Sequence, residues 1–419
     1  MASTTLWHTL PTEMKLAVVD NLDVADARIF SAVDQRTYAA CVPLLFKDVK
    51  LNNHTDLERF LENVPRAYCR HIEMLDLGTE GAARAHADAL ISLLLASPRL
   101  SQLVLRLNGS IHKSVISCFG FLGNLRHLTI RNCAEEEILP LSERLVVSIA
   151  ATVPDLRYLS LDRISRSTIH APELVGKYPF VPLVRGDEDI PDHPVLGSEL
   201  SLPSLLSIPS LRQLTIRDTH LGDPRWSSAP VACRLEVLDL GSCTHEPADP
   251  NRLAIECIMS AVGPSLSSFS LATALSAPGP DSDSPFAKAL STPLPRLRRL
   301  HISPFFPVDE VVDTMAALAG SPIEALSVQC FADDVADACG ALEAFLSMRV
   351  ARGPAFYEKL ARIDVSVAGA DGDADVSTED RERATKRLQD FCRDLRLTSK
   401  VAKPKSRLGD RLRSNSCAF

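Results

Sequence analysis

The sequence lacks several features that would mark an exported protein or one built around a metal site. Its 419 residues include 11 cysteines, an odd number, and no two of them form a Cys-x-x-Cys pair. We therefore expect neither a disulfide framework nor a structural zinc site, and we expect a reducing compartment. The first residues, MASTTLWHTLPTE, have neither a basic start nor an apolar core, so no signal peptide is expected. These features predict a cytoplasmic or nuclear protein.

An excess of basic residues is also missing. The 45 Lys and Arg residues are outnumbered by 53 Asp and Glu residues, which gives a formal net charge of −8. Nucleic-acid binding needs a basic face against the phosphates. Residues 257–280 carry no charge, but Ser, Gly and Pro recur among them, which is not typical of a membrane span. We expect neither nucleic acid nor a membrane among the partners.

Known catalytic patterns are missing as well. The chain has no G-x-S-x-G, no H-E-x-x-H, no G-x-x-x-x-G-K-[ST] and no dinucleotide-binding glycine cluster. Its 11 histidines are dispersed along the chain. We therefore assign no catalytic, metal-binding or cofactor-binding residue, and we expect a protein that is not an enzyme and acts by presenting a surface.

What the chain does contain is a repeated apolar spacing. The clearest copy, LRHLTIRNC at residues 125–133, fits L-x-x-L-x-L-x-x-N/C, and its Leu128 and Ile130 share one face of a strand. Nine further copies begin at residues 72, 100, 156, 211, 235, 266, 297, 323 and 360. Most of the spacings are close to the roughly 20–29 residues of a leucine-rich repeat. The gap from 156 to 211 is about twice as long, so it holds either a degenerate repeat or an insertion.

Helical stretches are expected between these strands, at 82–96, 141–152, 252–262, 308–318 and 335–350. Alternating strands and helices predict an α/β leucine-rich-repeat solenoid over residues 51–396, with a curved parallel sheet and helices on its convex side. Residues 167–205 are irregular and rich in proline, with an acidic run at Asp187–Asp189. We interpret them as a tolerated insertion, and the alternative is a binding element.

The first fifty residues follow a different pattern, which predicts three small helices. Thr9 and Pro11 suit a helix start, and Met14, Val18 and Leu22 then recur at helical spacing. Residues 25–40 form a second helical run, with Ala25, Ile29 and Val33 among the residues on one stripe; Pro43 is expected to interrupt it, and Phe46, Val49 and Leu51 already resemble a repeat strand. We expect these helices to cover the first repeat.

This N-terminal pattern resembles an F-box. The residues that carry the resemblance are Leu10, Pro11, Glu13, Val18, Leu22, Asp23, Asp26, Val33, Tyr38 and Pro43–Phe46. The F-box-like domain would span residues 6–50, and the whole chain resembles an F-box/leucine-rich-repeat protein of the kind abundant in fungi. Asp34, Ala27 and Phe46 stand where the family more often has Ser or Cys, Leu and Trp.

The resemblance implies a substrate adaptor of an SCF-type ubiquitin ligase. The F-box would dock on the Skp-type linker subunit, and through it on a cullin, while the repeats hold an unknown protein substrate. We expect a monomer within such a complex. The alternative is a leucine-rich-repeat scaffold whose F-box-like cap never joins a ligase. The docking residues would be Leu10, Pro11, Glu13, Met14, Val18 and Leu22.

The apolar residues near the chain start suit an interface core, although they could instead fold onto the first repeat. The substrate would bind residues that alternate with the apolar positions of the strands and so point to the concave face. This face mixes Arg, Asp, His and Tyr and suits another protein's polar surface; alternatively it is only a solvated sheet face. The candidates are Arg106, His127, Arg131, Tyr158, Asp162, Arg217, Asp239, Arg299, His301 and Arg362.

The end of the chain predicts a capping helix over residues 379–395, followed by a disordered basic tail over 397–419. Such a tail either remains solvated or contacts an acidic partner or the nuclear import machinery.

Overall fold

A computed structural model describes most of the chain. The described residues are 7, 10–80, 84–176, 181–223, 225–229, 231, 233–241, 248–275, 294–353 and 355–368, with 382, 383, 386, 387 and 390. Contacts divide the chain into two compact units. Unit 1 comprises Met1–Leu141 and Ser148–Leu156, and unit 2 comprises Ser142–Val147 and Arg157–Phe419. The expected domain boundaries at residues 50 and 396 differ from this division and stay a prediction.

The main feature is an 11-stranded parallel sheet in which the strands follow one another in chain order, with β6 and β7 left out. The strands of unit 1 are β1 Asp48–Leu51, β2 Met74–Glu80, β3 Gln102–Asn108 and β4 His127–Asn132. Those of unit 2 are β5 Tyr158–Asp162, β8 Gln213–Arg217, β9 Val237–Leu240, β10 Ser268–Leu271, β11 Arg299–Ile302, β12 Ala325–Cys330 and β13 Arg362–Val367.

Each strand of this sheet comes from one of the repeated apolar segments, including the early one at residues 46–51, so the predicted strand positions and the parallel sheet are confirmed. The pairing brings equivalent residues together. Leu75, Leu103 and Leu128 are aligned across β2, β3 and β4, and all three are buried. Within each unit, the buried row of one strand thus continues into the next, so neighbouring strands share apolar packing.

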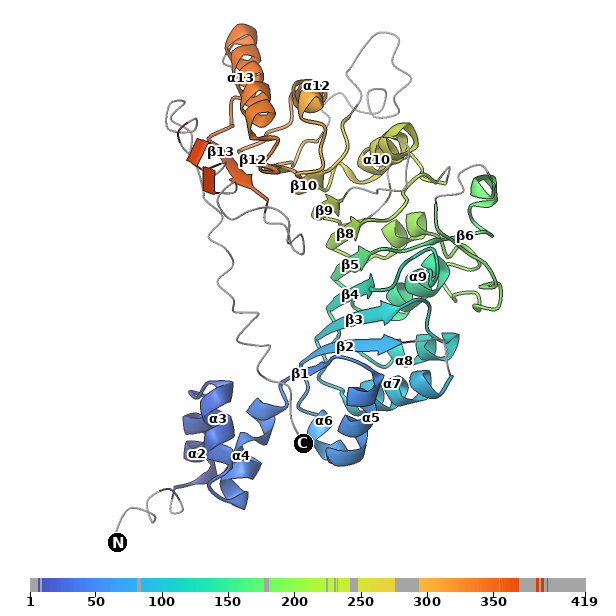
Figure 1. Cartoon of the computed structure of the whole chain (residues 1–419), viewed down its shortest axis with the longest axis vertical. Helices are drawn as coiled ribbons and strands as arrows, with labels where there is room; N and C mark the ends of the chain where they lie inside the picture. The colour runs from blue at the N-terminus through green and yellow to red at the C-terminus, as the bar shows by residue number, and fades with distance from the viewer. Residues whose placement is uncertain are drawn as a thin grey trace. The chain divides into compact units, whose positions relative to one another are not determined.

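Helices provide several of the crossovers between these parallel strands. Those of unit 1 are α5 His54–Asn63, α6 Arg66–Cys69, α7 Arg84–Ala96 and α8 Ile116–Phe119, and those of unit 2 are α10 Ala248–Val262, α12 Val311–Ala317 and α13 Val335–Arg352. Helix α9, Glu143–Thr152, has residues in both units. In Figure 1, α5, α7 and α8 lie on one side of β1–β4, and α10, α12 and α13 on one side of the later strands. Buried leucines such as Leu90, Leu93 and Leu94 hold α7 in place.

The N-terminal residues form three helices, α2 Thr12–Val19, α3 Val24–Ser31 and α4 Gln35–Leu45, which we call the helical module. The prediction of one helix over 25–40 was wrong, because extended Asp34 caps α4 by accepting hydrogen bonds from the backbone N–H groups of Arg36 and Thr37. Pro43 does not interrupt this helix but lies near its end. There its ring removes one hydrogen bond and no following turn is lost.

The long gap between repeats holds an insertion rather than a degenerate repeat, because β5 pairs directly with β8. The insertion is more ordered than its prolines suggest: β6 Arg166–Ser167 and β7 Leu183–Val184 form a small parallel sheet of their own. Ala171, Leu174 and Val181 make a small apolar cluster beside it.

Little of the C-terminal prediction falls on described residues. Residues 382, 383, 386, 387 and 390 are helical, while the rest of the expected capping helix and the basic tail lie outside the described residues. Across the described part of the chain, no helix is both long enough and apolar enough to cross a bilayer.

Candidate functional site

The helical module has an interior of its own. Val19, Ala27 and Cys41 are buried between its helices. Thr37 is also buried: its hydroxyl oxygen accepts a hydrogen bond from Nε1 of Trp7 at 2.7 Å and lies 3.1 Å from Oδ2 of Asp34. Asp34 therefore stabilises the start of α4 through both the backbone and the Thr37 hydroxyl.

Aromatic side chains join the helical module to the next helices of unit 1. Phe46 is buried at the end of α4, with its ring centroid 5.3 Å from that of Tyr68 and 6.3 Å from that of Phe60. The ring of Tyr38 lies 6.2 Å from that of Tyr68. The contacts to the next helices thus come from α4 and from the residue that follows it.

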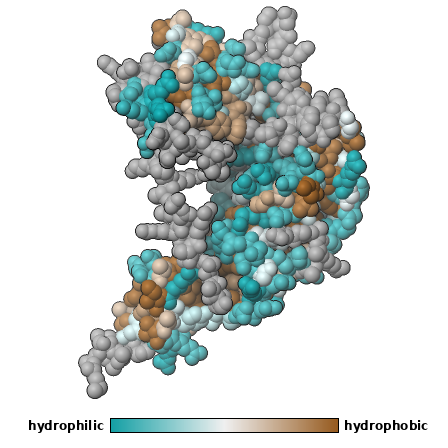
Figure 2. Space-filling view, in the orientation of Figure 1, coloured by the Kyte–Doolittle hydropathy of each residue, from teal (hydrophilic) through white to brown (hydrophobic). Residues whose placement is uncertain are grey.

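Helix α2 presents apolar side chains to solvent. Met14 is 54% exposed and Val18 43% exposed, and Pro11 and Glu13 are exposed beside them. Leu10 and Leu22, the other two predicted docking residues, are half-buried. Figure 2 shows apolar surface gathered over the helical module. The alternative that this cluster folds onto the first repeat does not hold for Pro11, Met14 and Val18.

Two further apolar residues are exposed that the sequence did not indicate as surface residues. Ile29 is 75% exposed and Val33 63% exposed, although their spacing predicts only that they share one stripe of the second helical run. Helical spacing shows that two residues share a face but not which way the face points. In α3 it is Ala27 that faces the interior.

The second candidate surface is the open face of the sheet, and in unit 1 it carries Arg106, His127 and Arg131. Nε of Arg106 lies 2.7 Å from Oδ1 of Asp76, and Nζ of Lys50 lies 3.5 Å from the other oxygen of this carboxylate. The strand register places Arg131 beside Arg106. His127 and Arg131 are exposed.

In unit 2 the open face carries the other seven candidates. Tyr158 is exposed at the start of β5, and Asp162 at its end is half-buried next to Arg217 in the register. Arg217 binds Asp239 with an Nη2–Oδ2 distance of 2.7 Å, and Arg362 forms an ion pair with Asp364. Arg299 is exposed at the start of β11. The structure therefore divides the ten predicted residues between two units.

His301 lies on the same face of unit 2. Burial lowers the pKa of His301, and the nearby Arg217 lowers it further, whereas Asp239 opposes the shift. The imidazole is therefore neutral at pH 7, and it adds hydrogen-bonding capacity rather than charge to the face.

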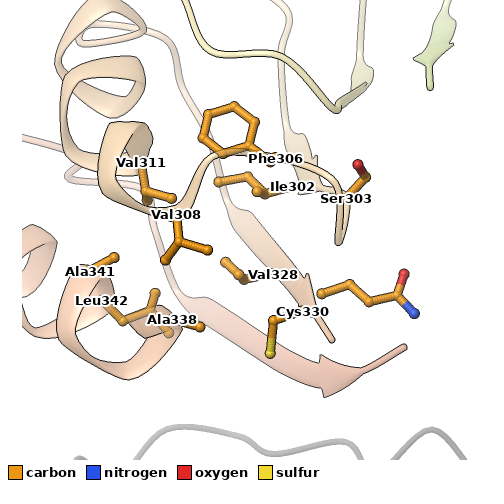
Figure 3. A pocket seen from close by; sticks show the side chains of 11 residues that line it. Ile302, Ser303, Phe306, Val308, Val311, Val328, Cys330, Ala338, Ala341 and Leu342 are labelled. Carbon is orange, nitrogen blue, oxygen red and sulfur yellow. The ribbon is translucent and has the colours of Figure 1, made fainter. Parts of the chain in front are cut away.

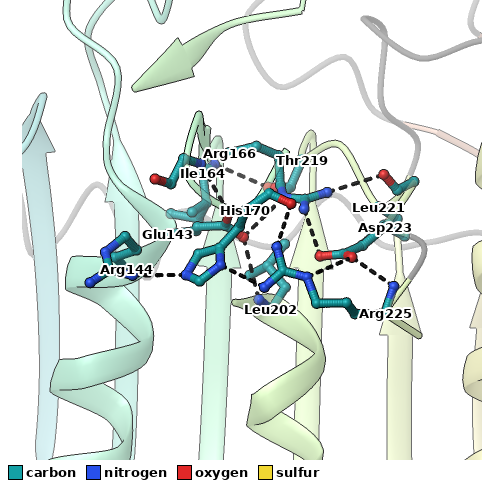
Figure 4. Close-up of polar contacts among 12 residues, drawn as sticks. Glu143, Arg144, Ile164, Arg166, His170, Leu202, Thr219, Leu221, Asp223 and Arg225 are labelled. Atoms are coloured by element: carbon teal, nitrogen blue, oxygen red, sulfur yellow. Dashed lines mark hydrogen bonds and ion pairs between the residues drawn. The ribbon is translucent and has the colours of Figure 1, made fainter. Parts of the chain in front are cut away.

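A cluster of buried charges that the sequence did not suggest lies in unit 2, where the insertion meets the start of α9 and the residues after β8 (Figure 4). Arg166 is completely buried, with Nε 3.0 Å from Oε2 of Glu143 and Nη2 2.6 Å from Oδ2 of Asp223. The other oxygen of Glu143 accepts the N–H of Ser167 at 2.9 Å. Burial raises the pKa of Glu143, and the attraction of Arg166 opposes this rise.

Asp187 forms a second centre of the same cluster. Its carboxylate accepts hydrogen bonds from the hydroxyl groups of Ser142, at 2.6 Å, and Ser167, at 2.8 Å. Asp187 is buried whereas Glu188 and Asp189 are exposed, so the acidic run is not uniformly solvated. These contacts tie the insertion to the start of α9.

His170 completes the cluster between two guanidinium groups, those of Arg144 and Arg225. Burial lowers its pKa to about 3, and both arginines add to this effect. The imidazole is neutral at pH 7 and accepts a hydrogen bond at only one ring nitrogen at a time. The polar atoms of the whole cluster contact one another. We therefore propose that the cluster stabilises the insertion and does not bind a ligand.

A small apolar cavity lies between the sheet and the helices of unit 2, lined by Ile302, Phe306, Val328 and Leu342 among others (Figure 3). Its volume of about 10 Å³ has room for about one water molecule, so it does not suit a cofactor. Among the described residues, no three His, Cys, Asp or Glu side chains come together as metal ligands would.

Function is therefore to be sought in the two surfaces, the helical module and the open face of the sheet. No protein-family model matches this chain, and no curated protein matches its sequence.

Proposed function

We propose that this chain is the non-catalytic substrate adaptor of an SCF-type ubiquitin ligase, acting in the cytoplasm or nucleus. Its helical module would be an F-box that binds a Skp-type linker subunit, and its sheet a leucine-rich-repeat solenoid that binds a protein target. The observation that carries the proposal is the exposure of Met14 and Val18 on a helix that buries Val19 instead.

This exposure has an energetic meaning. Burying a fully exposed apolar side chain of this size is worth roughly 1.5–3 kcal/mol, and about half of Met14 and of Val18 is exposed, so covering each would contribute about half of that value. Single exposed apolar residues are ordinary, but here several gather on one small module and follow the F-box-like pattern. Such a surface suits a partner that covers it with apolar residues of its own.

The repeat pattern supports the second half of the proposal. Each repeated segment contributes one strand, and neighbouring strands align the same apolar positions, as Leu103 and Leu128 do. This arrangement is typical of a solenoid, in which each unit buries its apolar face against the next. The intervening side chains remain available on the open face for a target.

Co-purification with a Skp-type linker tests the proposal. We expect the wild-type chain to retain the linker and Val18→Asp to lose it, because a carboxylate would have to be desolvated in an apolar interface. Val350→Asp is the matched control, since Val350 is likewise an exposed helical valine, 82% exposed on α13. It should bind like the wild type.

Equal retention by wild-type protein and both variants would overturn the docking surface. If the folded wild-type chain fails to bind the linker yet captures a protein through its sheet, the chain is an interaction scaffold with an F-box-like cap instead.

A further inference from the structure

The open face of unit 2 has a recessed polar row across its last five strands. The register aligns Asp239, Ser270, His301, Ser327 and Asp364, one from each of β9–β13. All five side chains are short or of medium length, so none of them projects far from the sheet. The two carboxylates are largely covered, with 20% of the Asp239 side chain and 16% of the Asp364 side chain exposed. The carboxylates therefore lie at the floor of this face.

Arginine side chains stand above the row. Arg217 reaches from β8 across to Asp239 on β9 and leaves 62% of its side chain exposed. Arg362 pairs with Asp364, two residues further along β13, and leaves 45% of its side chain exposed. Arg299 is exposed between them at the start of β11. A partner approaching this face therefore meets guanidinium groups first, because the opposite charges are already paired beneath them.

Gly241 makes the position of Arg217 possible. A Cβ atom at residue 241 would lie 2.8 Å from Cγ of Arg217, so any side chain there would push the arginine away. Arg217 donates one hydrogen bond, from Nη2 to Asp239, among the described residues. A guanidinium has five N–H donors, so most of them remain for a ligand.

From this geometry we infer that the open face of unit 2 binds a protein segment carrying several acidic side chains. The inference deepens the proposed function, because that segment would belong to the target. Carboxylates form strong, directional bonds with guanidinium groups. A basic segment would instead meet repulsion from the arginines and would have to displace them from Asp239 and Asp364.

The spacing of the row sets the spacing of the acidic residues. Asp239 and Asp364 are four strands apart, about 19 Å at about 4.8 Å per strand. The guanidinium groups that they hold have a similar separation, with Arg299 between them. An extended segment covers about 3.3 Å per residue and turns successive side chains to opposite faces, so acidic residues about six positions apart, with others at every second position between them, fit the three arginines.

Fluorescence anisotropy with the full chain tests this inference. The probe is a fluorescein-labelled Gly/Ser peptide with Glu at its third, fifth, seventh and ninth positions, and the comparison peptides carry Gln or phosphoserine there. We expect the Gln peptide to bind about tenfold more weakly or worse, and binding of the Glu peptide to weaken with added salt. Phosphoserine binding more than tenfold tighter than Glu would identify phosphate as the preferred oxyanion.

Variants of the chain locate the binding. Arg299→Gln should weaken binding of the Glu peptide about tenfold. Gly241→Ala should weaken it without removing any charge. Arg185→Gln, an exposed arginine of the insertion, is the matched control and should leave binding unchanged.

Equal binding of the Glu and Gln peptides, or no loss in Arg299→Gln and Gly241→Ala, would overturn the inference. Linker binding measured on the same samples separates it from the proposed function. Lost peptide binding with intact linker binding overturns the acidic segment alone, and the reverse overturns the ligase role alone.

Discussion

Arg166 is the largest completely buried side chain in the described structure, and it is charged. Moving a charge out of water is expensive unless partners satisfy it, and here Glu143 and Asp223 do so at 3.0 and 2.6 Å. The sequence could not suggest this, because Glu143 and Asp223 are 80 positions apart and no periodicity relates them. Such a network orders the insertion rather than leaving it a loose loop.

Removing the charge of Arg166 should therefore destabilise the folded chain strongly. Arg166→Met leaves Glu143 and Asp223 buried without their cation, and we expect a loss of about 3–5 kcal/mol of unfolding free energy. Chemical denaturation monitored by circular dichroism measures it. Arg185→Met, an exposed arginine of the same insertion, should change stability little. Equal losses in the two variants would contradict the role given to Arg166.

His170 should make stability depend on pH. Its pKa is about 3 in the folded chain and 6.5 for the free side chain, so between these values the unfolded chain binds a proton that the folded chain does not. Stability is then unaffected above about pH 6.5 and falls below it, by about 2 kcal/mol at pH 5. Thermal melts at pH 7 and pH 5 check this. The decrease should be smaller in His170→Gln, and an identical decrease would rule out His170 as the cause.

Strands and helices are the scale at which sequence reasoning succeeded most. The alternation around Leu128 and Ile130 placed its strand correctly, because in a strand spacing alone decides which residues share a face. Sequence reasoning failed to separate α3 from α4, because that boundary depends on one side chain: Asp34 starts α4 through its own hydrogen bonds. Spacing placed Met14 and Val18 on one stripe, but neither their exposure nor that of Ile29 and Val33 followed from it, since exposure depends on how the three helices pack.

A close approach in unit 1 gives a prediction at the scale of one strand. A Cβ at Gly78 of β2 would lie 2.1 Å from the backbone oxygen of Asn52, so Gly78→Ala forces the backbone to shift. We expect a loss of about 1–3 kcal/mol in thermal or chemical denaturation. At Gly123 an added Cβ meets nothing within 4 Å, and Gly123→Ala serves as the control. Similar stability of both variants would count against the close approach.

Because neighbouring strands pack against each other, disrupting the buried row of one strand should also loosen the adjacent strand. Leu128→Asp places an unpaired carboxylate in the buried row that Leu103 also occupies, so β4 and its neighbour should both loosen. Limited proteolysis should show new cleavage in residues 100–132. The same substitution at Thr129, the next residue on the open face, should leave the pattern unchanged. Unaltered resistance in Leu128→Asp would argue against the shared core.

At the scale of the whole molecule, the account divides two tasks between separate surfaces. In the function that we propose, the helical module would bind a ligase subunit through exposed residues of α2, and the sheet would present a polar face, topped by arginines in unit 2, to a target. The insertion, which sequence reasoning left open between a tolerated loop and a binding element, has a buried network that orders it. The exposed residues of the two surfaces have no role in filling the core, which is why we assign them to partners.

Hydrogen–deuterium exchange of the full chain, with and without a purified Skp-type linker, tests the central claim most directly. The account predicts that the linker slows exchange in residues 12–45, which form α2–α4, and leaves strands β8–β13 unchanged. Unchanged exchange throughout the helical module, at linker concentrations that saturate an F-box, would contradict it.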